Sequence, residues 1–169
     1  MTDEMIYLRR EKQFLVLLGI ISLALIGGAL YMQVVLGEAP CPLCILQRYA
    51  LLFIAVFAFI GAAMPGRLSL TICEALVTLS AVGGIVAAGR HVWIQSHPTE
   101  SCGIDVLQPI VDGLPLANLF PLGFQVAGFC ETPYPPVFGL SLAQWALAAF
   151  VLTVVLVPVG IIRNRMKAR

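Results

Sequence analysis

The sequence predicts an all-α membrane protein, a four-transmembrane-helix bundle with a long second loop on the outer side. Of its 169 residues, 60% are hydrophobic and only 11% are charged. The mean hydropathy of +0.96 is far above that of a soluble domain of ordinary composition. A net charge of +1, without a broad basic face, gives a nucleic-acid partner no electrostatic support.

Long gaps between the sparse charges outline the membrane spans. About 20 mostly apolar residues are needed to cross roughly 30 Å of hydrocarbon. The apolar runs lack the period-two alternation of a barrel, so each must satisfy its own backbone groups as a helix. We expect a single domain, residues 1–169, with transmembrane helices at about 14–35, 45–63, 68–89 and 140–160.

The first helix could instead be a cleaved signal peptide. However, its apolar run exceeds the usual length of about 7 to 15 residues, and no Ala-x-Ala site ends it. We therefore expect a retained helix.

The basic residues predict the orientation. Eight of the ten Lys and Arg residues precede the first helix, lie between the second and third, or follow the fourth: Arg9, Arg10, Lys12, Arg67, Arg163, Arg165, Lys167 and Arg169. By the positive-inside rule, both termini face the cytoplasm. The loops at about 36–44 and 90–139 then face outward, which means the periplasm if the chain lies in a bacterial inner membrane.

The second periplasmic loop is rich in proline, which argues against any extended regular element. Within it, the apolar segment Leu114–Phe120 has two interpretations. It could lie flat on the membrane surface, or it could fold over the helix bundle.

Four of the five cysteines fall in the outer loops: Cys41, Cys44, Cys102 and Cys130. Pairing Cys41 with Cys44 and Cys102 with Cys130 is the most economical of three connectivities. Both pairs could be structural staples. Chain entropy gives about 3.6 kcal/mol for the long loop but only about 2 kcal/mol for the short ring, before strain is subtracted. The Cys-x-x-Cys pair is thus a poor staple and a good redox couple. Cys73, inside the third helix, is expected to be a packing residue.

Polar residues accompany the first cysteine pair. Cys44 begins the second helix, where unsatisfied N–H groups and the helix dipole favour a thiolate. Arg48 lies one turn away on the same face, although it could merely extend to the membrane interface. His91 and Gln95 share a face at the outer end of the third helix. A lone interfacial histidine is more often an ordinary polar residue.

Two cysteine pairs outside the membrane could form a relay, because exchange between them needs only thiolate attack through mixed disulfides. The terminal oxidant must accept two electrons, and the sequence contains no haem or iron–sulfur motif and predicts no metal site. A membrane quinone meets this requirement. Arg48 and His91 would stabilise its reduced oxygen.

The segment Cys41-Pro42-Leu43-Cys44-Ile45-Leu46-Gln47-Arg48, followed by Cys102 and Cys130, resembles the bacterial DsbB family of disulfide bond formation proteins. The resemblance covers nearly the whole chain. It implies that the Cys102/Cys130 pair oxidises a DsbA-like thioredoxin-fold partner, with Cys102 forming the mixed disulfide. The Cys41/Cys44 pair would then reoxidise the loop pair and pass the electrons to ubiquinone, or to menaquinone without oxygen.

The resemblance also implies roles for the polar residues. Cys44 would be the quinone-facing sulfur, Arg48 would support quinone binding and the Cys44 thiolate, and His91 and Gln95 would line the quinone site. The family often has an acidic residue before Arg48, whereas this chain has Gln47.

Three rival interpretations remain. A homologue of vitamin K epoxide reductase would place its quinone-side Cys-x-x-Cys after the loop pair, whereas here it comes first. A tetrathiolate zinc site of the four outer cysteines is disfavoured by an oxidising compartment and by the unrepeated spacing. A purely structural scaffold has no use for a charged residue at the helix mouth.

Overall fold

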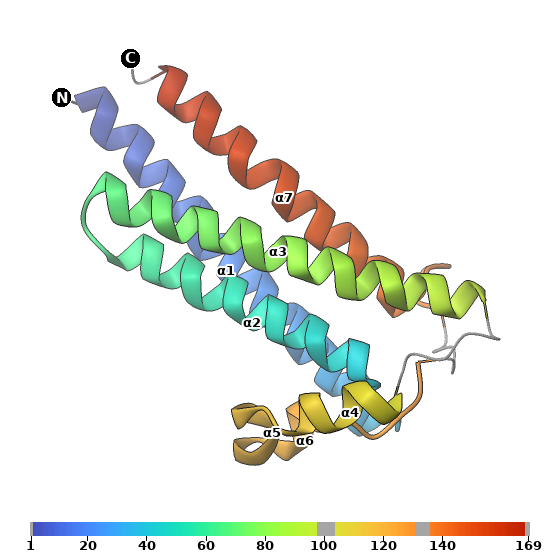
Figure 1. The fold of residues 1–169 in the computed structure, drawn as a ribbon. Helices are drawn as coiled ribbons and strands as arrows, with labels where there is room; N and C mark the ends of the chain where they lie inside the picture. The colour runs from blue at the N-terminus through green and yellow to red at the C-terminus, as the bar shows by residue number, and fades with distance from the viewer. Residues whose placement is uncertain (1, 98–103, 131–135, 168–169) are drawn as a thin grey trace.

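A computed structural model describes residues 2–97, 104–130 and 136–167 (Figure 1). Four of its helices are long and apolar enough to cross a membrane. They are α1 (Thr2–Val35), α2 (Pro42–Ala63), α3 (Arg67–Ser96) and α7 (Leu142–Lys167). The described residues contain no strand beyond an isolated bridge between Val137 and Leu140. The predicted all-α fold with four membrane-spanning helices is confirmed.

The long helices pack in a bundle around one apolar core. Helix α2 packs against both α1 and α3, and α7 packs against α3 (Figure 1). The outward faces are also apolar, as Leu79 and Val86 illustrate on α3, because they would meet lipid rather than water. The core is built mainly from fully buried side chains of all four helices, including Leu15, Ile54, Ala58, Leu70, Val77, Ala81 and Phe150.

Close approach of α3 and α7 depends on Gly84. A β-carbon built at this position would lie only 2.4 Å from the ring of Phe150, whereas one built at neighbouring Gly83 would meet nothing within 4 Å. Phe150 is fully buried, so its ring has little room to move. The missing side chain of Gly84 therefore provides the space that Phe150 fills.

We expect Gly84→Ala to destabilise the bundle by about 1–3 kcal/mol, the usual cost of overpacking a core. Unfolding in mixed detergent micelles, followed by circular dichroism, measures the effect. Gly83→Ala is the matched control and should be close to neutral. Equal stability of the two variants would contradict this account of the helix contact.

Three short helices lie together at one end of the bundle: α4 (Ile104–Asp112), α5 (Pro115–Leu119) and α6 (Pro121–Phe124). The start of α1, the end of α7 and the α2–α3 turn lie at the opposite end (Figure 1). Pro115 and Pro121 each occupy a first-turn position, where a missing N–H costs nothing. In this loop, proline therefore begins short helices as well as limiting long ones.

The apolar segment Leu114–Phe120 covers the first turns of α2. Leu114 and Leu116 pack against a cluster that contains buried Ile45 and Tyr49. Leu119, by contrast, is 80% exposed. The segment is folded onto the bundle on one side and presents apolar residues on the other.

Candidate functional site

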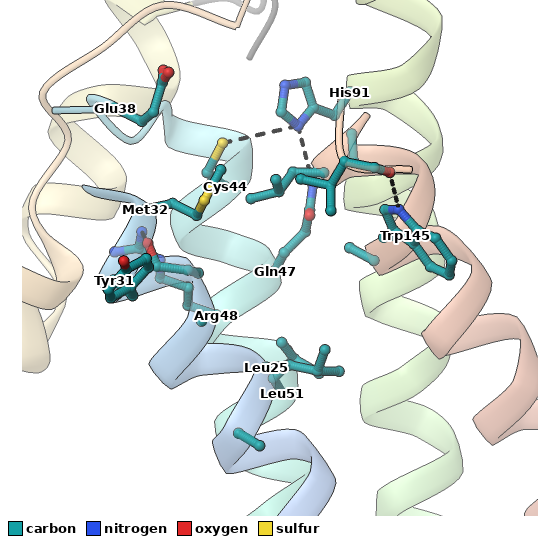
Figure 2. Close-up of a pocket in the computed structure, with 17 residues that line it drawn as sticks. Leu25, Tyr31, Met32, Glu38, Cys44, Gln47, Arg48, Leu51, His91 and Trp145 are labelled. Atoms are coloured by element: carbon teal, nitrogen blue, oxygen red, sulfur yellow. Dashed lines mark hydrogen bonds between the residues drawn. The ribbon is translucent and has the colours of Figure 1, made fainter. Parts of the chain in front are cut away.

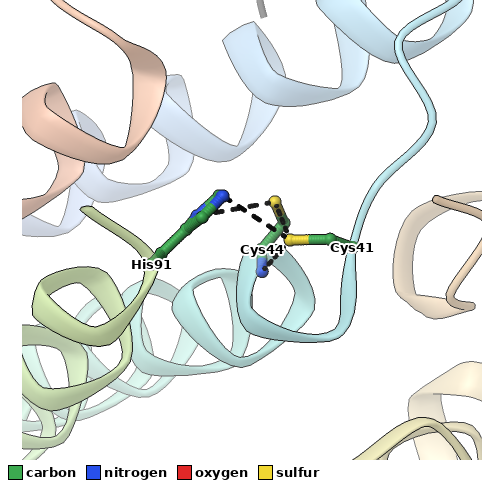
Figure 3. A group of neighbouring side chains, drawn as sticks. All are labelled: Cys41, Cys44 and His91. Atoms are coloured by element: carbon green, nitrogen blue, oxygen red, sulfur yellow. Dashed lines mark hydrogen bonds between the residues drawn. The ribbon is translucent and has the colours of Figure 1, made fainter. Parts of the chain in front are cut away.

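The first turn of α2 brings Cys41 and Cys44 together. Cys41 is the N-cap residue, and Pro42 follows with its fixed backbone at the helix start. The backbone N–H of Cys44 donates to the Cys41 sulfur over 3.3 Å. The two sulfurs lie 2.7 Å apart, and no disulfide joins them in this structure (Figure 3). The first turn of α2 thus places the two sulfurs within reach of each other, as a Cys-x-x-Cys redox pair requires.

The two sulfurs are chemically unequal. Cys41 is fully buried, and burial, followed by the neighbouring Cys44, raises the pKa of its thiol above the ordinary value. Cys44 is only partly buried and lies in the first turn, where helix N–H groups and the dipole favour negative charge. Cys41 therefore favours the protonated thiol, and Cys44 favours the thiolate.

His91, from α3, lies beside both sulfurs and is almost fully buried (Figure 3). Its Nε2 is 3.8 Å from the Cys41 sulfur, and its Nδ1 is 3.9 Å from the Cys44 sulfur. The side-chain amide of Gln47 lies 3.3 Å from Nδ1, and that of Gln95 lies 3.4 Å from Nε2. Each ring nitrogen thus has one sulfur and one amide as neighbours, which fixes the orientation of the imidazole.

Arg48 is buried, and its guanidinium points into the protein. Its guanidinium donates to the carbonyl of Gly123 over 2.6 Å and to Oε1 of Gln33 over 2.8 Å, with a longer bond of 3.4 Å to the carbonyl of Ala29. Gln33 in turn donates to the carbonyl of Leu122 over 2.7 Å. Arg48 therefore connects α1, α2 and the short helix α6.

A cavity of about 400 Å³ opens beside these residues (Figure 2). Cys44, Arg48 and His91 all contribute to its wall. Trp145 closes one side and donates through its indole N–H to the carbonyl of Val137 over 2.9 Å. The other lining residues are mostly apolar and come chiefly from α1 and the start of α7: Ala24, Leu25, Gly28, Ala29, Tyr31, Met32, Glu38, Gln47, Leu51, Leu142, Ala143 and Ala146.

The structure gives the sequence-predicted polar residues different positions. Arg48 and His91 line the cavity with Cys44, whereas Gln95 is absent from its wall and contacts His91 instead. Gln47, for which the sequence suggested no role, both lines the cavity and contacts His91. Its position three residues after Cys44, on the same face of α2, is the sequence feature that could have indicated this role.

Cys130 lies in the buried cluster that contains Cys41. It is disulfide-bonded and fully buried, and it belongs to the same apolar cluster as Cys41, Leu43 and Ile94. Cys102 lies outside the described residues. A disulfide-bonded Cys130 offers no thiolate to a metal ion.

Backbone hydrogen bonds hold residues 127–130, the Cys130 segment, in place. The N–H groups of Ala127 and Gly128 both donate to the carbonyl of Pro40, over 2.9 and 3.0 Å. A β-carbon at Gly128 would lie only 2.3 Å from the carbonyl oxygen of Ala39. The close approach of residues 127–128 to residues 39–40 therefore requires glycine at position 128, and it holds the chain before Cys130 beside the residues that precede Cys41.

Cys73 lies apart from these residues, within α3. It is buried and forms no disulfide. A β-carbon added at Gly61 on α2 would lie only 2.8 Å from the β-carbon of Cys73. This position fits the packing role expected from the sequence.

Comparison with known proteins identifies the family. The family model for disulfide bond formation protein DsbB matches residues 11–160. The chain is 83% identical to disulfide bond formation protein B 1 of Pseudomonas savastanoi pv. phaseolicola over 167 residues, which cover 99% of each chain. It is 76% identical to the protein of the same name from Pseudomonas putida, over 99% of this chain and all of that one. Disulfide bond formation protein B of Burkholderia pseudomallei is 54% identical over 96% of each chain. With four membrane-spanning helices and a buried Cys-x-x-Cys at the start of the second, this chain belongs to the DsbB family of disulfide bond formation proteins.

Proposed function

We propose that the protein reoxidises a DsbA-like, thioredoxin-fold thiol oxidase in the bacterial periplasm and passes the electrons to a membrane quinone. Electrons would enter at Cys102/Cys130, move to Cys41/Cys44 and leave through the cavity. The proposal rests mainly on the three side chains that line one wall of this cavity together. A redox-capable sulfur, a buried cation and an imidazole converge on one apolar space through Cys44, Arg48 and His91.

The proposed orientation places the cavity end of the bundle at the periplasmic face of the inner membrane. The opposite end carries the start of α1, the end of α7 and the α2–α3 turn, and these segments hold most of the basic residues. Basic residues flank the cytoplasmic ends of spans. Both termini would therefore be cytoplasmic, and both cysteine pairs would face the oxidising compartment.

The first transfer is a disulfide exchange. A partner thiolate attacks Cys102, forms a mixed disulfide and releases the Cys130 thiolate. The partner's second thiolate then attacks the partner sulfur of the mixed disulfide. The partner leaves with its two sulfurs joined in a disulfide, and the Cys102 thiolate is released. The partner loses two electrons, and the loop pair becomes a dithiol.

The second transfer requires the loop pair to reach the Cys41–Cys44 disulfide. Cys130 and Cys41 belong to one buried cluster, so the sulfur to be attacked lies in the same part of the protein as Cys130. A loop-pair thiolate attacks Cys41, and the Cys44 sulfur leaves as a thiolate in the first turn of α2, where the helix favours its charge. Attack by the second loop thiolate restores the loop disulfide and displaces the Cys41 sulfur as a thiolate, which takes up a proton, so that the α2 pair is left reduced.

The cavity suits a quinone. Its volume of about 400 Å³ is within the usual range for small-molecule sites, and its wall is mainly apolar with a few polar groups. Ubiquinone, or menaquinone, supplies a two-electron acceptor when bound. Arg48 would stabilise negative charge on a ring oxygen, and His91, held by Gln47 and Gln95, would carry a proton between sulfur and oxygen.

Quinone reduction by the purified protein tests this function. In detergent micelles, the protein is expected to reduce ubiquinone when supplied with a reduced thioredoxin-fold dithiol, with one quinone consumed for each partner disulfide formed. Absorbance of the quinone and thiol counting give the two quantities. Unchanged quinone absorbance with a folded protein would overturn the proposal.

Close packing of Gly128 on Ala39 should control transfer between the two pairs. We expect Gly128→Ala to displace the Cys130 segment, so that the loop pair accumulates in the reduced form while Cys41/Cys44 stays oxidised. Turnover should fall about tenfold or more, since a misplacement of about 1 Å is costly in a reacting pair. Thiol alkylation during turnover, followed by peptide mass spectrometry, reports the state of each pair.

Gly27→Ala serves as the control for Gly128→Ala, because a β-carbon there meets nothing within 4 Å. It should leave both turnover and the distribution of reduced cysteines unchanged. A Gly128→Ala protein with the same distribution as the native chain would contradict a role for this contact.

A further inference from the structure

We propose that the reduced Cys41/Cys44 pair and His91 form a binding site for one Zn²⁺ ion, which stops the pair from being reoxidised while it is bound. The inference rests on the proposed function, because only a pair that passes through a dithiol state presents two thiolates. Among the described residues, these three side chains are the group whose metal-binding atoms all lie within 4.8 Å of one another (Figure 3).

The donor atoms are close to the spacing that zinc requires. Zn–S and Zn–N bonds of about 2.3 and 2.05 Å in a tetrahedral site separate sulfur from nitrogen by about 3.6 Å and the two sulfurs by about 3.8 Å. At present Nε2 lies 3.8 Å from the Cys41 sulfur and Nδ1 lies 3.9 Å from the Cys44 sulfur. Zinc would take only one ring nitrogen, and one ligand atom from each of the three residues lies within 4.8 Å of the other two. Two small adjustments complete the site: one ring nitrogen must approach both sulfurs, and the sulfur–sulfur distance of 2.7 Å must increase. Repulsion between two thiolates favours the second change.

Support for the imidazole is already present. A zinc-bound histidine usually gives its other ring N–H to a polar neighbour, which fixes the tautomer and the ring plane. Gln47 lies beside Nδ1 and Gln95 lies beside Nε2. Whichever nitrogen binds the metal, the opposite nitrogen has an amide oxygen within reach once that amide is oriented as the acceptor.

The surroundings favour a neutral, thiolate-rich centre. Cys41 and His91 are nearly inaccessible to solvent, and two thiolates cancel the charge of Zn²⁺, which limits the cost of burial. Cys44 and His91 also line the cavity, so the fourth coordination position can open toward it. Binding at this position would place the metal between the sulfur and the proposed quinone site.

Zinc binding would be controlled by the redox state of the pair. Two Zn–S bonds and one Zn–N bond form, the protons of the two thiols are released, and no electrons are transferred. The oxidised disulfide has no thiolate and offers zinc only the imidazole. Periplasmic zinc would therefore hold the pair in its reduced state, whereas disulfide formation would expel the metal.

A variant that keeps only this pair tests the inference. Cys102→Ser with Cys130→Ser removes the other outer thiols, and the protein is reduced without oxygen, freed of reductant and titrated with Zn²⁺ against a coloured chelator. We expect one zinc per chain for the reduced protein and none after Cys41–Cys44 is oxidised. Cd²⁺ in place of Zn²⁺ should give the ultraviolet absorption of a metal–thiolate bond.

Replacement of His91 distinguishes a three-ligand zinc site from zinc that is held by the two thiolates alone. His91→Ala should weaken zinc binding about tenfold or more, while Cys73→Ala should leave it unchanged. If the double-serine variant does not fold, the comparison of His91→Ala with the native chain is made with all cysteines reduced, and Cys41→Ser should then remove one zinc per chain. Equal affinity with and without His91, or no stoichiometric zinc on folded reduced protein, overturns the inference.

The readout also separates this inference from the proposed function. Binding is measured without quinone or partner. An active quinone reductase that binds no zinc would overturn only the metal site. A protein that binds zinc but reduces no quinone would overturn only the electron transfer.

Discussion

Cys44→Ser is expected to lower quinone reduction by about 1,000-fold or more, because the serine oxygen cannot form the disulfide that accepts electrons from the loop pair. The partner could still exchange with Cys102/Cys130 once, but the loop pair would then remain reduced. Stopped-flow absorbance of the quinone measures the loss, and a single burst of partner oxidation should remain.

Cys73→Ala provides the control, since Cys73 is buried within α3 away from the cavity. Its turnover should be close to that of the native protein, with a small loss of stability from the missing sulfur. Sustained quinone reduction by a folded Cys44→Ser protein would show that electrons leave by another route.

Arg48→Met is expected to raise the quinone concentration for half-maximal rate about tenfold or more and also to destabilise the protein. The change removes a buried cation beside the cavity and leaves the carbonyl of Gly123 and the side chain of Gln33 without their donor. Hydrogen bonds from charged groups contribute about 1.5–3 kcal/mol each, and 1.4 kcal/mol corresponds to a factor of ten in binding. Steady-state kinetics and detergent unfolding measure the two effects.

Two further variants distinguish the effect of the positive charge of Arg48 on quinone binding from the effect of its hydrogen bonds on stability. Arg48→Lys keeps the charge but cannot reproduce the forked geometry of the guanidinium, so quinone affinity should be partly restored. Gln33→Ala removes one partner and leaves the cation, so stability should fall more than quinone affinity. An unchanged half-saturating quinone concentration in a folded Arg48→Met protein would count against the proposed role of this residue.

The membrane helices could be predicted because charge and hydropathy along the chain directly reflect the cost of placing a group in lipid. The short helices α5 and α6 were not predicted. The prolines of this loop argue against an extended regular element, which leaves room for helices as short as α5 and α6, and proline is favourable in the first turn of a helix.

The contacts of Arg48 show where sequence reasoning stops. Its closeness to Cys44 follows from helical spacing within α2. Its bond to the carbonyl of Gly123 joins residues 75 positions apart, and it depends on how α6 folds back on the bundle. Likewise, residues 127–128 lie beside Pro40, just before Cys41, because two backbone N–H groups donate to the carbonyl of Pro40. Such a backbone contact leaves little pattern in side-chain types.

The order in which the two cysteine pairs become reduced tests the relay most directly. Fully oxidised protein without quinone is mixed with the reduced partner, quenched at successive times and alkylated. The account predicts that thiols appear first at Cys102 and Cys130 and later at Cys41 and Cys44, and that added quinone reoxidises Cys41 and Cys44 before the loop pair. Reduction of Cys41 and Cys44 while the loop pair is still oxidised would contradict it.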